Sequence, residues 1–213
     1  MFLAAVAKPN EQWDFDGCVG CWPITIEKVA QRSSKNRPKG TIEEVNITLD
    51  GALFIKMMKE NLGDSIKEKL QWAKNVTVQL DGAGGHAPKQ SIDELNDWGK
   101  QQKPTIEFVL QPARSPDLNA LDLGAWTSMQ ATVDSYKDQI VNDPEKTGNS
   151  ENLLIQAVKN AFIEWTKENH LKKFFETLQL QYGYVLDANG DVVNPKHQKR
   201  NKKKILTTFQ TEW

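Results

Sequence analysis

The chain has 213 residues, of which 38% are hydrophobic and 26% charged, and its formal net charge is −1. This length fits one large domain or one domain with an appendage, and the near-neutral charge means that affinity for a polyanion must come from local basic patches. No apolar run approaches the roughly 18 residues of a membrane-spanning helix.

The N-terminal segment predicts two strands and a polar loop. Residues 1–7 are apolar without a basic leader, which indicates a buried strand rather than a signal peptide. Residues 9–20 indicate a loop, and Trp22 to Ile26 a second strand. Residues 30–40 form a polar loop, either simply solvated or in contact with a DNA backbone. Its basic residues are Arg32, Lys35, Arg37 and Lys39.

The two cysteines, Cys18 and Cys21, form a C-x-x-C pair. A zinc site needs two further ligands, and the sequence has no second Cys or His pair. A thioredoxin-like motif would open a helix, whereas a strand is predicted here. Ordinary buried or half-exposed thiols are therefore the favoured interpretation.

Helical and strand patterns alternate in the middle of the chain. From Asp50, apolar residues at helical spacing predict a buried stripe that Gly63–Ser65 interrupts. Residues 76–80 and 105–110 predict two strands. Between them, Ser91 and Glu94 form a capping box, which places a helix at about 92–102.

The remainder of the chain is predicted to be mainly helical. A helix begins near Ala120 and directs Trp126, Met129 and Val133 to one face. After a connection at 142–149 come two amphipathic helices, the first capped by Ser150. Residues 184–193 predict a hairpin around an Asn-Gly turn. The basic tail that follows contains Lys196, Lys199, Arg200, Lys202, Lys203 and Lys204.

This order predicts an α/β fold with a mixed sheet flanked by helices. The chain is predicted to divide into residues 1–141 and a helical extension at 142–213 that contains the hairpin and the basic tail.

Asp81 ends one strand just before a glycine-rich segment, and Asp122 follows the next strand. Carboxylates at the carboxyl ends of strands project into the crevice where α/β proteins place metal or phosphate chemistry. Two such acids are by themselves a weak indication of a metal site.

The sequence around these acids resembles mariner-type DDE transposases. Residues 81–86, D-G-A-G-G-H, are similar to their D-N-A-x-x-H segment, and residues 115–122, S-P-D-L-N-A-L-D, to their S-P-D-L-N-P-x-E/D segment. Segments at 2–7, 32–40 and 121–126 resemble one eukaryotic branch of the superfamily. The resemblance covers about residues 1–135 densely and the rest loosely.

The resemblance implies an RNase H-like fold and metal-dependent DNA strand cleavage and transfer with two Mg²⁺ (or Mn²⁺) ions about 4 Å apart. It assigns Asp81 and Asp122 as catalytic carboxylates and metal ligands. His86 matches the family's histidine. Its side chain could either pack beside the end of the strand or take part in catalysis. Asp117 is expected to hold its loop through local hydrogen bonds. The implied partners are DNA, at transposon ends and target, and a second copy in a homodimer, with a nuclear location.

The sequence also departs from the family pattern. The family's first carboxylate lies on a central strand just upstream of the segment that matches residues 1–7, so the chain is expected to lack that carboxylate and that strand, which would leave unpaired sheet edges. Gly82 and Ala120 replace the usual Asn and Pro. Whether the chain is an enzyme is therefore open, and we expect it to be inactive and to bind metal weakly. It could be a fragment of a longer protein, a decayed gene copy, or the partner of another molecule that supplies the strand.

Two other functions remain open. One is a non-enzymatic nucleic-acid-binding or interaction protein that retains the scaffold, with DNA contacts from Arg32, Lys35, Arg37 and the tail residues 196–204; the tail is otherwise a solvated like-charge run or a nuclear address. The other is a redox role for Cys18 and Cys21.

Overall fold

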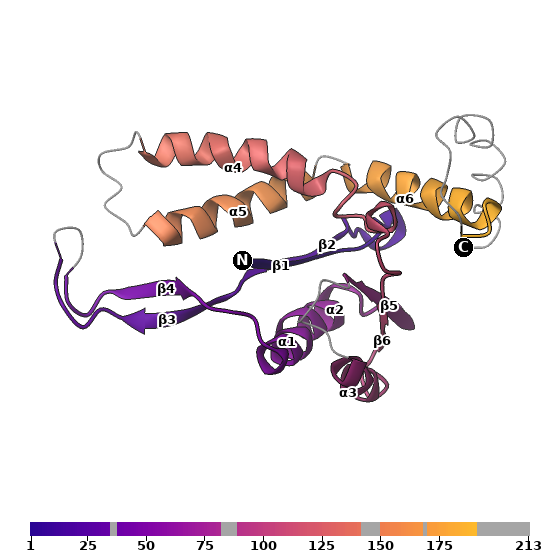
Figure 1. The fold of residues 1–213 in the computed structure, drawn as a ribbon, viewed down its shortest axis with the longest axis horizontal. Helices are drawn as coiled ribbons and strands as arrows, with labels where there is room; N and C mark the ends of the chain where they lie inside the picture. The colour runs from indigo at the N-terminus through magenta and orange to yellow at the C-terminus, as the bar shows by residue number, and fades with distance from the viewer. Residues whose placement is uncertain (35–37, 82–88, 142–149, 168–169, 191–213) are drawn as a thin grey trace.

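The fold is mixed α/β, with short sheets between layers of helices (Figure 1). The computed structural model describes residues 1–34, 38–81, 89–141, 150–167 and 170–190. Within them the strands form three two-stranded sheets, in which β1 pairs with β2, β3 with β4, and β5 with β6. The strands are β1 (Phe2–Val6), β2 (Cys18–Pro23), β3 (Thr25–Val29), β4 (Ile42–Asn46), β5 (Asn75–Leu80) and β6 (Thr105–Leu110).

The first two sheets are antiparallel and β5–β6 is parallel. The predicted α/β class is thus confirmed, but the described strands form three separate pairs rather than the one mixed sheet that was predicted. The helices connect and cover the strands. They are η1 (Glu11–Trp13), α1 (Gly51–Met57), η2 (Met58–Leu62), α2 (Gly63–Lys69), α3 (Lys89–Gly99), η3 (Pro116–Leu118), α4 (Ala125–Val141), α5 (Ser150–Lys167) and α6 (His170–Asp187).

Strand β1 lies between two helical layers, with α1, α2 and α3 on one side and α4, α5 and α6 on the other (Figure 1). Its side chains alternate between two hydrophobic clusters. Leu3 and Ala5 pack against the first cluster, which is built from α1 to α3 and the strands. Ala4 and Val6 pack against the second, which contains Phe162 and other residues of α4 to α6. This alternation follows from the period of two in a strand, and it explains why every residue of β1 is apolar.

Helices α5 and α6 belong to this second layer rather than standing apart from residues 1–141. Helix α5 packs against α4 and β2, and Asn152 accepts a hydrogen bond from the Glu44 backbone amide at 3.3 Å. The predicted extension therefore shares a hydrophobic core with the segment before it.

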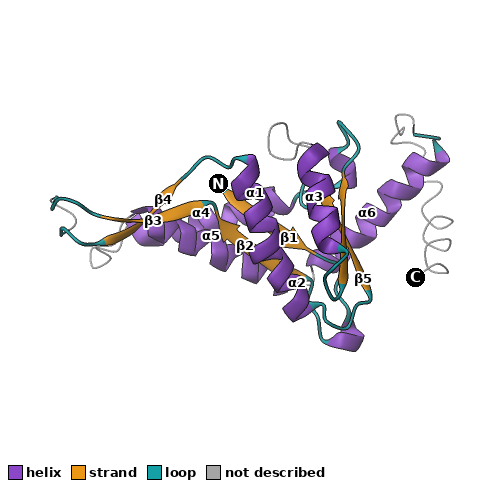
Figure 2. Cartoon of the chain, turned by 90° about the horizontal axis from the view of Figure 1, so that it is seen from below, coloured by secondary structure: helices purple, strands orange, loops and turns teal. Residues whose placement is uncertain are grey.

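Several predicted boundaries are wrong. The loop predicted at 9–20 already contains the start of β2 at Cys18, and the strand predicted at 22–26 is divided between β2 and β3. Strand β4 was not predicted at all. It pairs with β3 in an arm that projects from the body (Figure 2). An exposed arm of this kind needs no apolar alternation, which is the signal that the prediction used.

Two helix starts also differ from the prediction. Helix α3 begins at Lys89, so Ser91 lies inside it and is buried rather than at the N-cap. Helix α4 begins at Ala125 and not near Ala120, because residues 120–123 form turns. Met129 and Val133 are buried as predicted, whereas Trp126 is 42% exposed and the neighbouring Ala125 takes the inward position.

The helix predicted from Asp50 is confirmed, but its interruption at Gly63–Ser65 is not. Asp50 caps α1 by accepting a hydrogen bond from the Leu53 amide at 2.8 Å. The helix then passes through a π-helical segment, η2, into α2. Gly63 suits close packing rather than a break, since a Cβ there would overlap the indole of Trp98.

The hairpin predicted at 184–193 is wrong over its described part, because α6 continues to Asp187. The Asn-Gly pair ends the helix: Asn189 and Gly190 both have positive φ, and the Gly190 amide donates to the Val185 carbonyl at 2.9 Å. Residues with positive φ are as typical of helix C-termini as of hairpin turns. Among the described residues, no helix is both long and apolar enough to cross a membrane.

Candidate functional site

The candidate site lies at the carboxyl end of the parallel pair β5–β6. Asp81 follows β5 directly. The Gln111 amide, just after β6, donates to the Leu80 carbonyl at 2.8 Å, so the two strands remain paired up to this edge. Parallel strands present their carboxyl ends on the same side, and the segment that leaves β6 therefore begins beside Asp81.

The segment from Gln111 to Gly124 folds back toward β5 through its own hydrogen bonds. The Gln111 side-chain amide donates to the Ser115 carbonyl at 2.5 Å, and the Leu118 amide donates to the same carbonyl at 3.0 Å. These bonds hold the short helix η3, whose Leu118 side chain is buried. The segment is thus a fixed turn rather than an open loop.

A hydrogen bond from β5 attaches this turn to the strand. The Gln79 side-chain amide donates to the Leu118 carbonyl at 2.6 Å. The Tyr182 hydroxyl of α6 donates to the other end of the same side chain, Gln79 Oε1, also at 2.6 Å. Because Gln79 is two residues before Asp81, this contact holds the turn close to the candidate acid.

Asp122 is oriented by Asn119. Asn119 Oδ1 accepts from the Leu121 amide at 2.9 Å, and the Asn119 carbonyl accepts from the Asp122 amide at 3.1 Å. Side-chain hydrogen bonds to the turn come from Asn119, Gln79, Gln111, Ser115 and Tyr182. Asp117, to which the sequence assigned this role, is exposed and makes none of these bonds.

The two acids interact electrostatically. The pKa of Asp122 is raised above its ordinary value of 3.8, first by partial desolvation and then by the negative charge of Asp81, while a hydrogen bond with Asn119 acts in the opposite direction. Two carboxylates from separate elements, of which the charge of one raises the pKa of the other, can share a proton or bind a cation. The structure thus brings together the two residues that the sequence singled out.

Most of the other residues predicted for the site are not described by the structure. His86 lies outside the described residues, as do Lys35, Arg37 and the tail residues Lys196, Lys199, Arg200, Lys202, Lys203 and Lys204. Arg32 is described and exposed. It follows β3 in the segment that joins β3 to β4, and the β3–β4 arm points away from β5 and β6 in both views (Figures 1 and 2).

The described part of the chain contains no metal site of three or more ligands. Within the described residues, no group of three His, Cys, Asp or Glu side chains could hold a metal ion. Asp81 and Asp122 are both exposed, and hard cations prefer carboxylate oxygens. The pair therefore fits a weakly held divalent cation that keeps most of its water.

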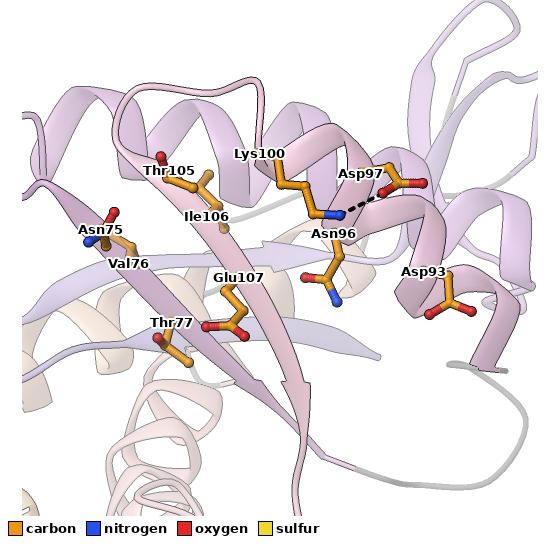
Figure 3. A pocket seen from close by; sticks show the side chains of 10 residues that line it. All are labelled: Asn75, Val76, Thr77, Asp93, Asn96, Asp97, Lys100, Thr105, Ile106 and Glu107. Carbon is orange, nitrogen blue, oxygen red and sulfur yellow. Dashed lines mark hydrogen bonds and ion pairs between the residues drawn. The ribbon is translucent and has the colours of Figure 1, made fainter.

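A surface cavity lies elsewhere, over the first halves of β5 and β6 and along α3 (Figure 3). Its charged side chains include Asp97, which pairs with Lys100 at 2.9 Å, and Asp93 and Glu107. It is therefore at the amino ends of the parallel strands, away from Asp81, and does not contribute to the candidate site.

The cysteines do not form a reactive pair. Burial, followed by the negative charge of Cys18, raises the pKa of Cys21 from 9.0 to about 11, although Lys159 opposes the shift. A thiol with so high a pKa is rarely a thiolate at neutral pH and is a poor nucleophile.

The positioning residues Gln79, Gln111, Asn119 and Tyr182 were missed by sequence reasoning. Gln79 was detectable, because it is a polar residue between Val78 and Leu80, next to the end of its strand. Tyr182 was not, since its contact joins residues 103 positions apart. Comparison with family models, with curated proteins and with solved structures finds no match.

Proposed function

We propose that this chain is a transposon-derived DDE transposase domain with an RNase H-like arrangement, from a family that cleaves and joins DNA, and that residues 1–213 alone are inactive. The observation that supports the proposal is the electrostatic coupling of Asp81 and Asp122 at the carboxyl end of a parallel strand pair. These are the two acids that the resemblance assigns as catalytic. They are 41 positions apart in the sequence (122 − 81 = 41) and follow two different strands.

Asp81 and Asp122 are the residues that would hold a divalent cation, Mg²⁺ or Mn²⁺. Such a cation would supply Lewis-acid stabilisation for the oxygens of a phosphodiester. Two exposed carboxylates without a third ligand among the described residues bind it weakly, and this is why we propose an inactive chain. Asn119 and Gln79 would hold the acids at this edge.

Cation binding is tested with Mn²⁺, whose unpaired electrons broaden nearby NMR signals. We expect selective broadening of the amide signals of Asp81, Asp122 and their neighbours, and its loss in Asp81→Asn. Asp117→Asn is the matched control, because Asp117 is an exposed acid of the same turn. Broadening that is equal in the two variants would remove the acid pair from the proposal.

Inactivity is tested by incubating supercoiled DNA with the purified chain and Mg²⁺ or Mn²⁺. We expect no nicking. Efficient nicking that disappears in Asp81→Ala would contradict inactivity while supporting the assigned residue.

The second candidate function is non-enzymatic binding of DNA. In this proposal the protein binds DNA as a homodimer and is located in the nucleus. Exposed Arg32 and Lys39 at the end of the β3–β4 arm favour it. DNA affinity measured over a salt series tests it, because each phosphate contact contributes to the slope of log K against log salt. We expect the slope to fall in Arg32→Ala and further when 195–213 are deleted; an unchanged slope in both excludes these contacts.

The oligomeric state of the DNA-bound protein and its cellular location are tested separately. Sedimentation with and without DNA should show a dimer in the complex. A fluorescent fusion of residues 196–204 should enter the nucleus. A monomeric complex or a fusion that stays outside would each exclude that part of the proposal.

A further inference from the structure

A groove lies at the base of the β3–β4 arm, where the arm meets helix α1 and the π-helical segment η2. Its volume is about 380 Å³, toward the lower end of the about 300–1,000 Å³ that is usual for ligand pockets in proteins. None of the residues that line it belongs to β5, β6 or the turn that carries Asp122. The groove is therefore built from side chains other than those of the candidate site.

The floor of the groove is apolar. It is formed by Trp22, Pro23 and Ile24 around the end of β2 and by Leu53 and Met57 of α1. Two of these, Ile24 and Met57, are buried core residues, and the other three are only half-buried. The half-buried side chains leave apolar surface that a ligand can cover.

The rim of the groove carries three carboxylates from three elements, Glu27 of β3, Glu44 of β4 and Glu60 of η2. Glu27 and Glu44 are directly opposite each other in the antiparallel register, an arrangement that is unfavourable for two like charges. The Thr25 hydroxyl holds Glu44 on this face by donating a hydrogen bond to its Oε2 at 3.0 Å. A cationic partner would relieve the repulsion that this arrangement maintains.

The charge of the lining favours a positively charged ligand. Among the residues that line the groove, Lys56 alone is basic, so three carboxylates and one ammonium give a charge of −2 (−3 + 1). The Lys56 Nζ lies 3.8 Å from Glu60 Oε2 and both side chains are 64% exposed, so this ion pair contributes little. A negative lining repels phosphates, and the groove is therefore unsuited to DNA.

The three carboxylates are not placed to hold one metal ion. Within the described part of the chain, which includes all three, no group of three His, Cys, Asp or Glu side chains could do so. Their charges are instead distributed around an apolar floor. A fitting partner has separate positive charges on apolar stems, as arginine and lysine side chains do.

The groove is suited to side chains rather than to an added strand. Helix α5 covers the edge of β4 at Glu44, whose backbone amide donates to Asn152 Oδ1 at 3.3 Å. A partner that extends the sheet needs such backbone groups to be available. Recognition in the groove therefore depends on its apolar floor and its acidic rim.

We propose that this groove binds an arginine-containing segment of another polypeptide. Two arginine side chains would lay their stems on Trp22 and Leu53, with one guanidinium stacked on the indole. Their charged ends would pair with Glu27 and Glu44 on the arm and with Glu60 on η2, which neutralises the lining. Arginine fits better than lysine, because a planar guanidinium bonds both oxygens of a carboxylate and also stacks on an aromatic ring.

The probe is a synthetic pentapeptide, Ala-Arg-Ala-Arg-Ala, acetylated and amidated so that its ends carry no charge. Alternate residues of an extended peptide point to the same side, so both arginines can face the groove. The control peptide has citrulline in place of both arginines, which keeps the shape of the side chain and removes its charge.

Binding to the full chain is followed by NMR, through the amide signals of Trp22, Leu53 and Met57 and the indole signal of Trp22. We expect saturable shifts of these signals with the arginine peptide. The affinity should fall as salt is added, because the carboxylates are partly exposed and salt screens such pairs. The citrulline peptide should bind at least about tenfold more weakly, since it forms no ion pair.

Variants of the rim locate the bound peptide. Glu27→Gln and Glu60→Gln should each weaken binding about two- to fivefold, the range expected for one partly exposed ion pair. Lys56→Gln should strengthen binding about twofold, because it removes the positive charge of the lining. Glu68→Gln is the matched control, an exposed acid of α2 outside the groove, and it should have no effect.

Four results would each overturn the proposal. The first is the absence of saturable shifts at about 1 mM arginine peptide. The second is equal affinity for the citrulline peptide, and the third is unchanged affinity in both Glu27→Gln and Glu60→Gln. The fourth is a shift of the groove signals that grows with protein concentration without peptide, which would make a second copy of this chain the occupant. Asp81 and Asp122 take no part in this experiment, so its outcome is independent of the proposed chemistry.

Discussion

The side chain of Gln79 lies between two elements that are distant in the sequence, accepting a hydrogen bond from the Tyr182 hydroxyl at 2.6 Å and donating one to the Leu118 carbonyl at 2.6 Å. One amide thus connects β5, the turn before Asp122 and helix α6. The position of the candidate acids therefore depends on a side chain that is not itself acidic.

The first prediction concerns this amide. Gln79→Ala should lower the free energy of unfolding by about 1–3 kcal/mol, since it removes two hydrogen bonds and leaves the Leu118 carbonyl with the longer bond from the Tyr182 hydroxyl, at 3.3 Å. Releasing the turn should also lower the pKa of Asp122, because Asp81 would no longer be held near it. Chemical denaturation and carboxyl NMR titration measure the two effects.

Tyr182→Phe is the matched control for Gln79→Ala. It removes the hydroxyl but keeps the bond from Gln79 to Leu118, so it should cost about 1 kcal/mol and leave the pKa of Asp122 in place. An equal pKa change in both variants would mean that α6, not Gln79, positions the turn.

The second prediction is the pH dependence of Asp122. Its pKa is raised in the folded state, so the native protein binds this proton more tightly than the unfolded chain does. The contribution of Asp122 to stability is therefore greatest below pH 3.8 and declines as the pH rises through the raised value. Asp81→Asn should lower the pKa of Asp122 and flatten this decline, with a change in stability at neutral pH below about 1 kcal/mol.

Carboxyl NMR titration of the wild type, Asp81→Asn and Asp117→Asn checks this prediction. Asp117→Asn should have no effect on the Asp122 titration. If Asp81→Asn also leaves it unchanged, burial alone raises the pKa and the two acids do not interact.

The third prediction concerns Asn96 of α3, whose side chain bonds to both the amide and the carbonyl of Phe108 on β6. Asn96→Ala should lower the free energy of unfolding by about 2–4 kcal/mol, because the amide and the carbonyl of Phe108 both lose their partner within the core. Asn96→Asp retains the acceptor for the Phe108 amide but loses the donor, so its cost should be intermediate at a pH where the aspartate is charged. Urea denaturation gives both values, and equal costs would mean that only the donor matters.

The fourth prediction compares two glycines in helices. A Cβ at Gly99 would overlap the Ile106 backbone, whereas a Cβ at Gly51 would contact nothing within 4 Å. Gly99→Ala should therefore destabilise the protein by more than about 2 kcal/mol, since α3 must move away from β6. Gly51→Ala should be neutral or stabilising by up to about 1 kcal/mol. Thermal unfolding of the two variants gives the comparison, and a harmless Gly99→Ala would show that α3 is not tightly packed against β6.

The fifth prediction is that Cys21 resists alkylation. With a pKa of about 11 rather than 9.0, its thiolate fraction at pH 8 is about a hundredfold lower, so iodoacetamide should modify it about a hundredfold more slowly than an ordinary thiol. Mass spectrometry after timed quenching measures the rate in the native protein and, as a control, in urea. Rapid modification of native Cys21 would revive the redox interpretation.

The two strands next to the candidate site were predictable because β-branched and other apolar residues recur along both. Residues 76–80 and 105–110 were placed within one residue of β5 and β6. Asp81 and Asp122 were found for the same reason, as polar residues that follow such strands. Local periodicity contains this information, and no long-range contact is needed to read it.

The rest depended on tertiary contacts. The Cys18–Cys21 spacing would place the two thiols on opposite faces of a regular strand, but both pack against the second hydrophobic cluster. A bulge at Val19 restores them to one face, and Ser65 and Lys69 of α2 hydrogen-bond to its carbonyl. The Asn189-Gly190 pair likewise became a helix end because α6 had core contacts to continue toward Tyr184. Neither outcome is encoded within the few residues concerned.

The π-helical segment Met58–Leu62 has a consequence for how this helix tolerates changes in length. A π turn contains one residue more than an α turn, and here it lets Met57, Met58 and Leu62 all reach the core in one continuous helix. In a regular α-helix Phe54 and Ile66, 12 positions apart, would differ in direction by about 120°, and the extra residue of the π turn lets both face the core. Deleting one residue from this segment should therefore restore regular α geometry and keep Phe54 and Ile66 on one face, so the helix should tolerate a one-residue deletion here better than a one-residue insertion.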